Sequence, residues 1–375
     1  MRSKSSMMIG AAVASMLIIP AAAGDNGWVV WPARTVPGTN SLRIEHVVGN
    51  VRVAVADGPM KVEASGQRDM MSGLSVKPDG GVLRISGSDM SDVYVWDWKH
   101  WFDFSHIHEH GDKEGKLYIK VTVPKGASVA IDNLVGDANV GDTYGPLRME
   151  TTAGDATVGK VTEAKITLAG SGKTSVNEVM GELRIEIDGS GRVTVNKTAS
   201  VRAEINGSGD TQIGTVMGGA NVDINGSGDF SAKSVHGPLR VSIAGSGNVK
   251  IADGFADPLR VDIIGAGDLF FGGTANNPTI TAMGSGNVHI KSYTGKLRND
   301  GMADVIIGDR VYPANGMVPP VPPIPPVNVH VPEMNIHVPA VNIHIPPAPP
   351  APPAPPAPPA PHYHHHSDDD DDGDN

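Results

Sequence analysis

The chain has no cysteine. This absence excludes disulfide bonds, thiol catalysis and a lipidated N-terminal cysteine. Basic residues are also scarce: 30 Lys and Arg stand against 41 Asp and Glu, which gives a formal net charge of −11. Nucleic acid and anionic lipid are bound by clustered Lys and Arg, so we expect neither as the main partner. The apolar run of Met7 to Ile19 is too short to span a membrane comfortably as a helix, and no other stretch could span it as a helix.

Glycine, in contrast, is abundant and marks a repeat between residues 137 and 304. Turns of the Gly-Ser-Gly type return there ten times, as in LRIEIDGSGRVTV (183–195) and LRVSIAGSGNVKI (239–251). The residue that closes each turn serves as a marker, and successive markers are 17 to 20 residues apart. The ten markers are Asp137, Asp155, Lys173, Arg192, Asp210, Asp229, Asn248, Asp268, Asn287 and Asp304. A fixed period of this length with strand-like content predicts a stacked β-solenoid.

The positions within the repeat are as regular as its period. Two and four residues before the first glycine of each turn, and six after it, the side chains are almost purely aliphatic. Side chains alternate between the two faces of a strand, so these positions line one interior and build a continuous core. Five residues before the glycine most repeats carry Lys or Arg, and three before it many carry Asp or Glu. In a stack of strands these positions form a basic row beside an acidic row on the exposed face. The two rows predict either an ion-paired, solvated face or a ladder that binds a repetitive polymer.

The sequence therefore predicts an all-β protein, a single-stranded parallel β-helix or β-solenoid, right-handed, with about ten rungs of 17–20 residues. Residues 1–23 have the basic start, apolar core and small residues of a cleaved signal peptide. We expect a lead-in or cap at 24–41, the solenoid at 42–312 with a less regular N-terminal β region, and an aromatic and His-rich insertion at 89–115. A Pro-rich spacer (313–361) and a His- and Asp-rich tail (362–375) follow, and low complexity predicts disorder there.

Three segments carry a resemblance to a known family. LRIEHVVGNVRVAVADGPMKVEASG (42–66), KLYIKVTVP (116–124) and the stack of GSGD and GSGN turns resemble the autotransporter adhesin, head GIN domain family. The resemblance covers about residues 42–308 and implies an exported bacterial protein with a β-solenoid fold. It implies no catalytic residues, because the shared pattern contains no catalytic motif. The Pro-rich tail departs from an autotransporter, since it does not read as the strands of a C-terminal membrane barrel.

Candidate site residues lie where the repeat is interrupted. In the insertion, Trp96, Trp98 and Trp101 could stack on sugar rings, and His106, His108 and His110 could bind Zn²⁺, Cu²⁺ or Ni²⁺. The alternative is an apolar flap that covers the solenoid. In the tail, a loosely bound divalent transition metal is expected at four histidines, which are His362, His364, His365 and His366. No other cofactor is expected. Calcium is disfavoured at the turns, because Lys173 and Arg192 occupy the position of the aspartates.

These features favour a non-enzymatic exported protein of the cell envelope or surface that acts as an adhesion or binding scaffold. The acidic residues are spread evenly over the rungs, whereas a polysaccharide lyase or hydrolase needs a local group of catalytic side chains. The expected partner is a cell-envelope or extracellular polymer or protein, and the location is the periplasm, the outer surface or the medium. Two alternatives stay open: a periplasmic metal-binding protein that uses its histidines, and a polysaccharide-binding or polysaccharide-processing β-helix.

Overall fold

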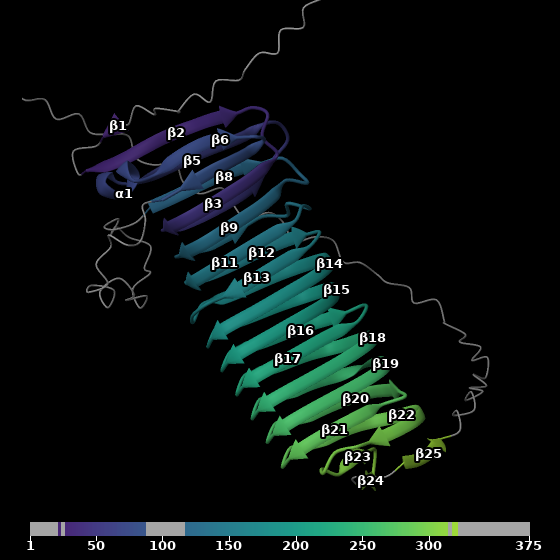
Figure 1. Ribbon diagram of the computed structural model, residues 1–375. Helices are drawn as coiled ribbons and strands as arrows, with labels where there is room; N and C mark the ends of the chain where they lie inside the picture. Colours follow the sequence, from purple (N-terminus) through teal and green to yellow (C-terminus); the bar gives the residue numbers. More distant parts are fainter. Residues whose placement is uncertain (1–21, 24–26, 88–116, 314–316, 322–375) are drawn as a thin grey trace, which may run out of the picture. The chain divides into compact units, whose positions relative to one another are not determined.

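The computed structural model describes residues 22–23, 27–87, 117–313 and 317–321, and most of them lie in β-strands (Figure 1). The N-terminal elements are β1 (Ala22–Ala23), β2 (Trp28–Val36), β3 (Ser41–Val48), β4 (Asn50–Val55), β5 (Met60–Gln67), α1 (Arg68–Ser72), β6 (Ser75–Asp79), β7 (Val82–Ser86) and β8 (Leu117–Val123). The regular stack consists of β9 (Ser128–Val135), β10 (Ala138–Val140), β11 (Leu147–Ala153), β12 (Asp155–Val161), β13 (Ala164–Leu168), β14 (Lys173–Gly189), β15 (Arg192–Gly207), β16 (Asp210–Val216), β17 (Ala220–Gly226), β18 (Asp229–Gly245), β19 (Val249–Gly265), β20 (Leu269–Asn276), β21 (Thr279–Gly284), β22 (Val288–Asn299) and β23 (Val305–Ile307). Two antiparallel strands close it, β24 (Arg310–Tyr312) and β25 (Met317–Val321).

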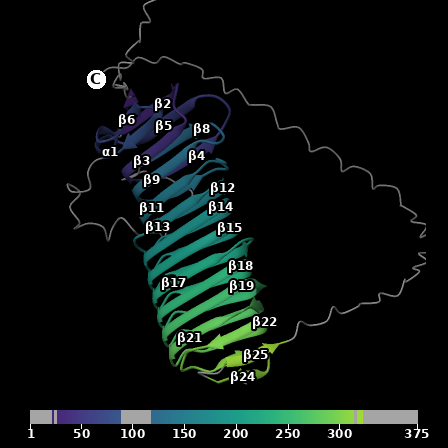
Figure 2. The same ribbon diagram turned by 45° about the vertical axis from the view of Figure 1, so that its right-hand side comes forward.

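Each repeat forms one coil of a parallel β-solenoid, which has about nine turns (Figure 2). A coil holds one strand before the glycine corner, on what we call the first face, and one strand after it, on the second face. The pairing of β14 with β15 shows both, because Ile185 lies opposite Ala203 on the first face and Val176 opposite Val195 on the second. The same register runs from coil to coil, and it aligns the ten marker positions of the sequence in one column. The predicted solenoid is therefore confirmed.

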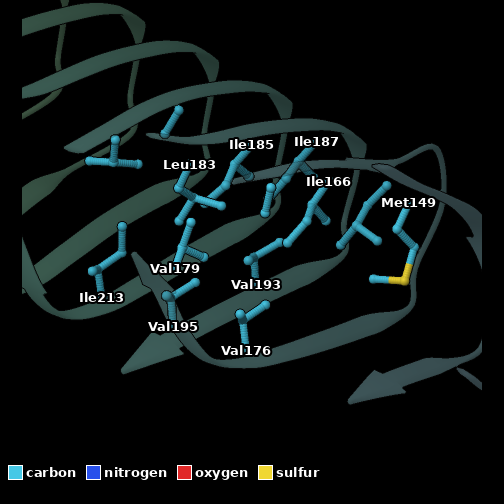
Figure 3. Packing of buried hydrophobic residues seen from close by; sticks show 14 of the residues in the cluster. Met149, Ile166, Val176, Val179, Leu183, Ile185, Ile187, Val193, Val195 and Ile213 are labelled. Atoms are coloured by element: carbon cyan, nitrogen blue, oxygen red, sulfur yellow. The ribbon is translucent and has the colours of Figure 1, made fainter. Parts of the chain in front are cut away.

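The aliphatic positions of the repeat form the core between the two faces. Ile166, Ile185 and Ala203 are in register on successive strands of the first face, and all are at most 2% exposed. Val176, Val193 and Val195 approach them from the second face (Figure 3). Every coil adds similar side chains, so one unbroken hydrophobic cluster runs from Val29 to Ile307 among the described residues. Burial of apolar surface in this cluster is the main source of stability.

Stacking explains the glycines at the corner. A Cβ built on Gly228 would lie 2.3 Å from the carbonyl oxygen of Gly209, the equivalent glycine one coil earlier. Gly226, which opens the same corner, has a φ of +138°, a backbone conformation that residues other than glycine rarely adopt. Corner backbones thus approach too closely for any larger residue.

The marker side chains form a polar ladder beside this corner. The Oδ1 atom of Asp137 accepts the backbone N–H of Asp155 at 2.9 Å, and Oδ1 of Asp155 accepts the backbone N–H of Lys173 at 3.1 Å. Further along, Oδ1 of Asp268 accepts the backbone N–H of Asn287 at 2.8 Å. At five of the markers the Asp or Asn side chain satisfies a backbone donor of the next coil, and these are Asp137, Asp155, Asp229, Asn248 and Asp268.

The N-terminal coils are stacked in an order that differs from their order in the chain. Strand β3 pairs with β7 on one side and β9 on the other, and β4 pairs with β8 and β10. The coil of β3 and β4 therefore lies between the coil of β7 and β8 and the coil of β9 and β10. Antiparallel pairing of β2 with β5, β5 with β8 and β6 with β7 closes this end. These antiparallel strands leave the N-terminal region less regular than the stack.

Candidate functional site

A groove of about 670 Å³ opens on the second face at the N-terminal end of the solenoid. Its walls come from β2, β4, β5, β8, β10 and β12, the region drawn in purple to blue-teal in Figure 1. We call it the N-terminal groove. The side chains that determine its chemistry are Trp31, Arg52, Glu63, Tyr118, Lys120 and Asp137.

Strand register places the charged side chains of the groove in one row. Glu63 on β5 lies opposite Lys120 on β8, and Lys120 lies opposite Arg52 on β4. The row continues to Asn139 on β10. Lys120 Nζ is 2.9 Å from Glu63 Oε1, whereas Arg52 makes no ion pair within the part of the chain that the structure describes. Neighbouring strands are ~4.8 Å apart, so the groove presents hydrogen-bonding groups at short, regular intervals.

Aromatic side chains form the wall on the side of β2 and β8. The Tyr118 side chain is 39% exposed, and its ring centroid lies 6.2 Å from that of Trp28. Trp31 is half-buried, and Pro32 follows it where the register between β2 and β5 shifts. Proline donates no hydrogen bond, which is tolerated at an edge of a sheet. The groove therefore combines aromatic rings with polar groups, as sites for small or linear polar ligands do.

The carboxylates of the groove already have structural partners. Glu63 pairs with Lys120, and Asp137 and Asp155 each accept a backbone N–H of the following coil. The described residues also contain no group of three His, Asp or Glu side chains that could hold a metal ion.

The first face carries the two charge rows that the repeat predicts. Arg43 lies between Arg84 and Ala130, and the basic row continues through Arg148 and Lys165. Asp132 in the acidic row is 9% exposed, and it accepts hydrogen bonds from Arg43 at 3.1 Å and Arg148 at 3.0 Å. The ion-paired interpretation is confirmed for this part of the face. The pairs link one coil to the next, because each partner lies on a neighbouring strand.

The ten candidate residues of the sequence lie outside the described residues. Trp96, Trp98, Trp101, His106, His108 and His110 belong to the segment between β7 and β8, and His362, His364, His365 and His366 belong to the tail. The metal and sugar-stacking roles of these side chains stay predictions. The described residues on either side of the insertion are part of the fold. The backbone N–H of Gly87 donates to the backbone oxygen of Glu45 at 3.0 Å, and β8 begins at Leu117.

Sequence reasoning missed the N-terminal groove. Its residues come from six strands whose spatial order is not their chain order, so their proximity is invisible in the sequence. One signal was present: Tyr118 is a large aromatic at an outward position, where the regular repeats mostly carry Asp or Asn. Trp31 was visible too, but only as part of a lead-in segment.

Comparison with known families identifies the fold's relatives. The family described as "Putative auto-transporter adhesin, head GIN domain" matches residues 44–216 and 215–296, well over half of the chain. The chain belongs to this family. The resemblance seen in the sequence is thereby confirmed, and the matched residues of this head GIN domain contain most of the N-terminal groove and of the regular stack. No curated protein matches the chain.

Several solved structures match the head GIN domain at low sequence identity. A "putative lipid binding protein" from Parabacteroides distasonis ATCC 8503 is 16% identical over 73% of this chain and 99% of its own, with a TM-score of 0.38. A "putative adhesin" from the same organism is 19% identical over 76% and 98%, with a TM-score of 0.35. A "putative adhesin" from Bacteroides fragilis NCTC 9343 is 18% identical over 60% and 96%, with a TM-score of 0.32. None of these names describes an enzyme.

The described part of the head GIN domain protein holds no helix with the length and apolar character that crossing a membrane requires.

Proposed function

We propose that the protein is an exported, non-enzymatic β-solenoid that acts as a binding and adhesion scaffold at the cell envelope or surface, and that its N-terminal groove holds a saccharide chain. Membership of a family of autotransporter adhesin head domains supports adhesion. The leader-like residues 1–23 support export to the periplasm, the outer surface or the medium. The Pro-rich residues 313–361 suit a spacer that holds the head away from its attachment point.

The observation that carries the ligand class is the composition of the N-terminal groove. Tyr118 and Trp31 offer ring faces, on which the apolar faces of sugar rings stack. Arg52 and Asn139 offer donors for sugar hydroxyl and ring oxygens beside these rings. The carboxylates are engaged with Lys120 and with backbone donors, which favours retention of a polysaccharide over its cleavage.

Binding of purified envelope and extracellular polysaccharides to the mature chain tests this proposal. Tyr118→Ala and Trp31→Ala should each weaken binding by about tenfold, since one aromatic contact contributes roughly 0.5–1.5 kcal/mol beyond the area it buries. Phe270→Ala is the matched control, because Phe270 is 40% exposed on β20, far along the stack. Loss of binding in the control as well, or no binding to any polysaccharide, contradicts the saccharide groove. Release of oligosaccharides during incubation contradicts the non-enzymatic role.

A further inference from the structure

A second groove, of about 380 Å³, lies on the first face in the middle of the stack. Five consecutive coils line it, from Glu182 on β14 to Arg260 on β19. Pro238 and Pro258 form part of one side, and Arg202, Arg240 and Arg260 project from the basic row. With strands ~4.8 Å apart, the groove extends about 20 Å along the solenoid, which suits an extended ligand. We call it the arginine groove.

Strand register sets the spacing of its cations. Arg202 lies opposite Asn221, Asn221 opposite Arg240, and Arg240 opposite Arg260. Arg240 and Arg260 are therefore one strand apart, roughly 5 Å, and Arg202 and Arg240 are two strands apart, roughly 10 Å. Asn221 replaces a basic residue within this row, and its Oδ1 is buried without a hydrogen-bond partner. A donor on a bound ligand could satisfy this amide after a small rotation of the side chain.

The arginines of this groove differ from the other basic residues of the row. Near the N-terminal end, Arg43 and Arg148 are neutralised by the buried carboxylate of Asp132. In the arginine groove, neither Arg202 nor Arg260 forms an ion pair with any described residue, and both are exposed. Arg240 Nη2 lies 3.7 Å from Asp262 Oδ2, a long pair between half-exposed side chains, and such pairs are weak. Glu182, the acidic residue of the lining, is bound to Arg184.

The surroundings of the groove narrow the ligand class. The acidic row, with Glu204, Asp223 and Asp262, runs beside the arginines on the same face. A nucleic acid or another dense polyanion would be repelled by these carboxylates and by the net charge of −11. A polysaccharide with widely spaced acidic groups fits both rows, because its anions can pair with arginine and its hydroxyls can donate to the carboxylates.

We propose that the arginine groove binds a linear anionic polysaccharide, whose carboxylate or sulfate groups pair with Arg202, Arg240 and Arg260. This site is independent of the N-terminal groove, which lies on the other face. It gives one scaffold two binding surfaces for extended saccharide chains, so that a chain can bridge or align along several coils.

Binding of the mature chain to polygalacturonate, chondroitin sulfate, dextran and polyphosphate at about 0.15 M salt tests the proposal. We expect polygalacturonate or chondroitin sulfate to bind in a way that depends on these arginines, which identifies carboxylate or sulfate as the recognised group, whereas any binding of neutral dextran should not depend on them. The double variant Arg202→Gln/Arg260→Gln should lower the affinity at least about tenfold. The control Arg192→Gln/Arg298→Gln removes the same charge elsewhere and should stay within about twofold, because both side chains lie outside the groove.

Three outcomes overturn the proposal: no binding to either acidic polysaccharide, an equal loss in the control variant, or equally tight binding of polyphosphate that the double variant does not weaken. Thermal unfolding of each variant verifies that it is folded. Tyr118→Ala should retain acidic polysaccharide binding at the arginine groove, so failure of one groove is distinguishable from failure of the other.

Discussion

Asn248 donates both its backbone N–H and its side-chain amide to one atom, Oδ1 of Asp229, each at 3.0 Å. The two residues occupy the marker position of successive coils, 19 residues apart. From Asp229 to Asn287 the ladder therefore holds successive glycine corners together through a side chain as well as through the strands. The aspartates of these turns have a structural task that needs no bound ion.

Replacing Asp229 tests the ladder. Asp229→Ala removes both hydrogen bonds to Asn248 and should lower the free energy of unfolding by about 1 kcal/mol. Asp229→Asn keeps an oxygen acceptor and should cost less than half as much, as Asn248 itself accepts the N–H of Asp268 at 3.3 Å. Urea denaturation of the three proteins gives the comparison. Equal costs for the two variants, or a large stabilisation of the wild type by calcium, would speak against the ladder.

A second prediction concerns the close approach of corner backbones. Gly247→Ala places a Cβ 2.3 Å from the Gly228 oxygen and 2.7 Å from Cγ2 of Ile224. Neighbouring coils must shift to make room, so we expect a loss of about 1–3 kcal/mol in unfolding free energy. Gly141→Ala is the control, because the nearest atom to its new Cβ, the Val53 oxygen, is 3.4 Å away. A thermal denaturation midpoint unchanged in Gly247→Ala contradicts the steric account.

The histidines permit a metal-removal prediction for the binding-scaffold proposal. Titration calorimetry with Zn²⁺ and Cu²⁺ should show weak, unselective binding that disappears when residues 362–375 are deleted. Chelation with EDTA should leave polysaccharide binding unchanged. A tight, selective site that is lost in the triple variant His106→Ala/His108→Ala/His110→Ala would instead favour the metal-binding alternative.

The sequence predicted the repeated part of the fold in detail and the end regions poorly. Periodicity alone aligned Ile185 with Ala203 and placed Arg184 and Arg202 in one outward row, as the register of β14 and β15 has them. It could not order the N-terminal coils, because β3 pairs with strands 40 and more residues away on both sides. The same reason hid the N-terminal groove. The arginine groove was foreseen only as a charge row, since the sequence does not reveal which arginines lack acidic partners.

The C-terminal end of the stack yields a prediction about alkaline stability. The Tyr293 ring is 6% exposed and meets the Tyr312 ring edge-on at 5.8 Å. Its hydroxyl is buried and has no hydrogen-bond partner among the described residues. Burial, with the neighbouring phenol of Tyr312, raises the pKa of Tyr293 from 10.0 to about 12. The fold therefore favours the neutral phenol.

The sign of the pH effect follows from this raised pKa. The contribution of Tyr293 to stability is complete below pH 10 and is lost as the pH rises through about 12. Phenylalanine cannot ionise, so between pH 9 and 12 the unfolding free energy of Tyr293→Phe should fall by roughly 1–2 kcal/mol less than that of the wild type. At pH 7 it should be as stable as the wild type or slightly more so, because it removes an unpartnered buried hydroxyl. The control is Tyr118→Phe, at an exposed position. Its unfolding free energy, measured by urea denaturation, should fall with pH as that of the wild type does. An equal fall in Tyr293→Phe would show that Tyr293 does not ionise on unfolding in this range.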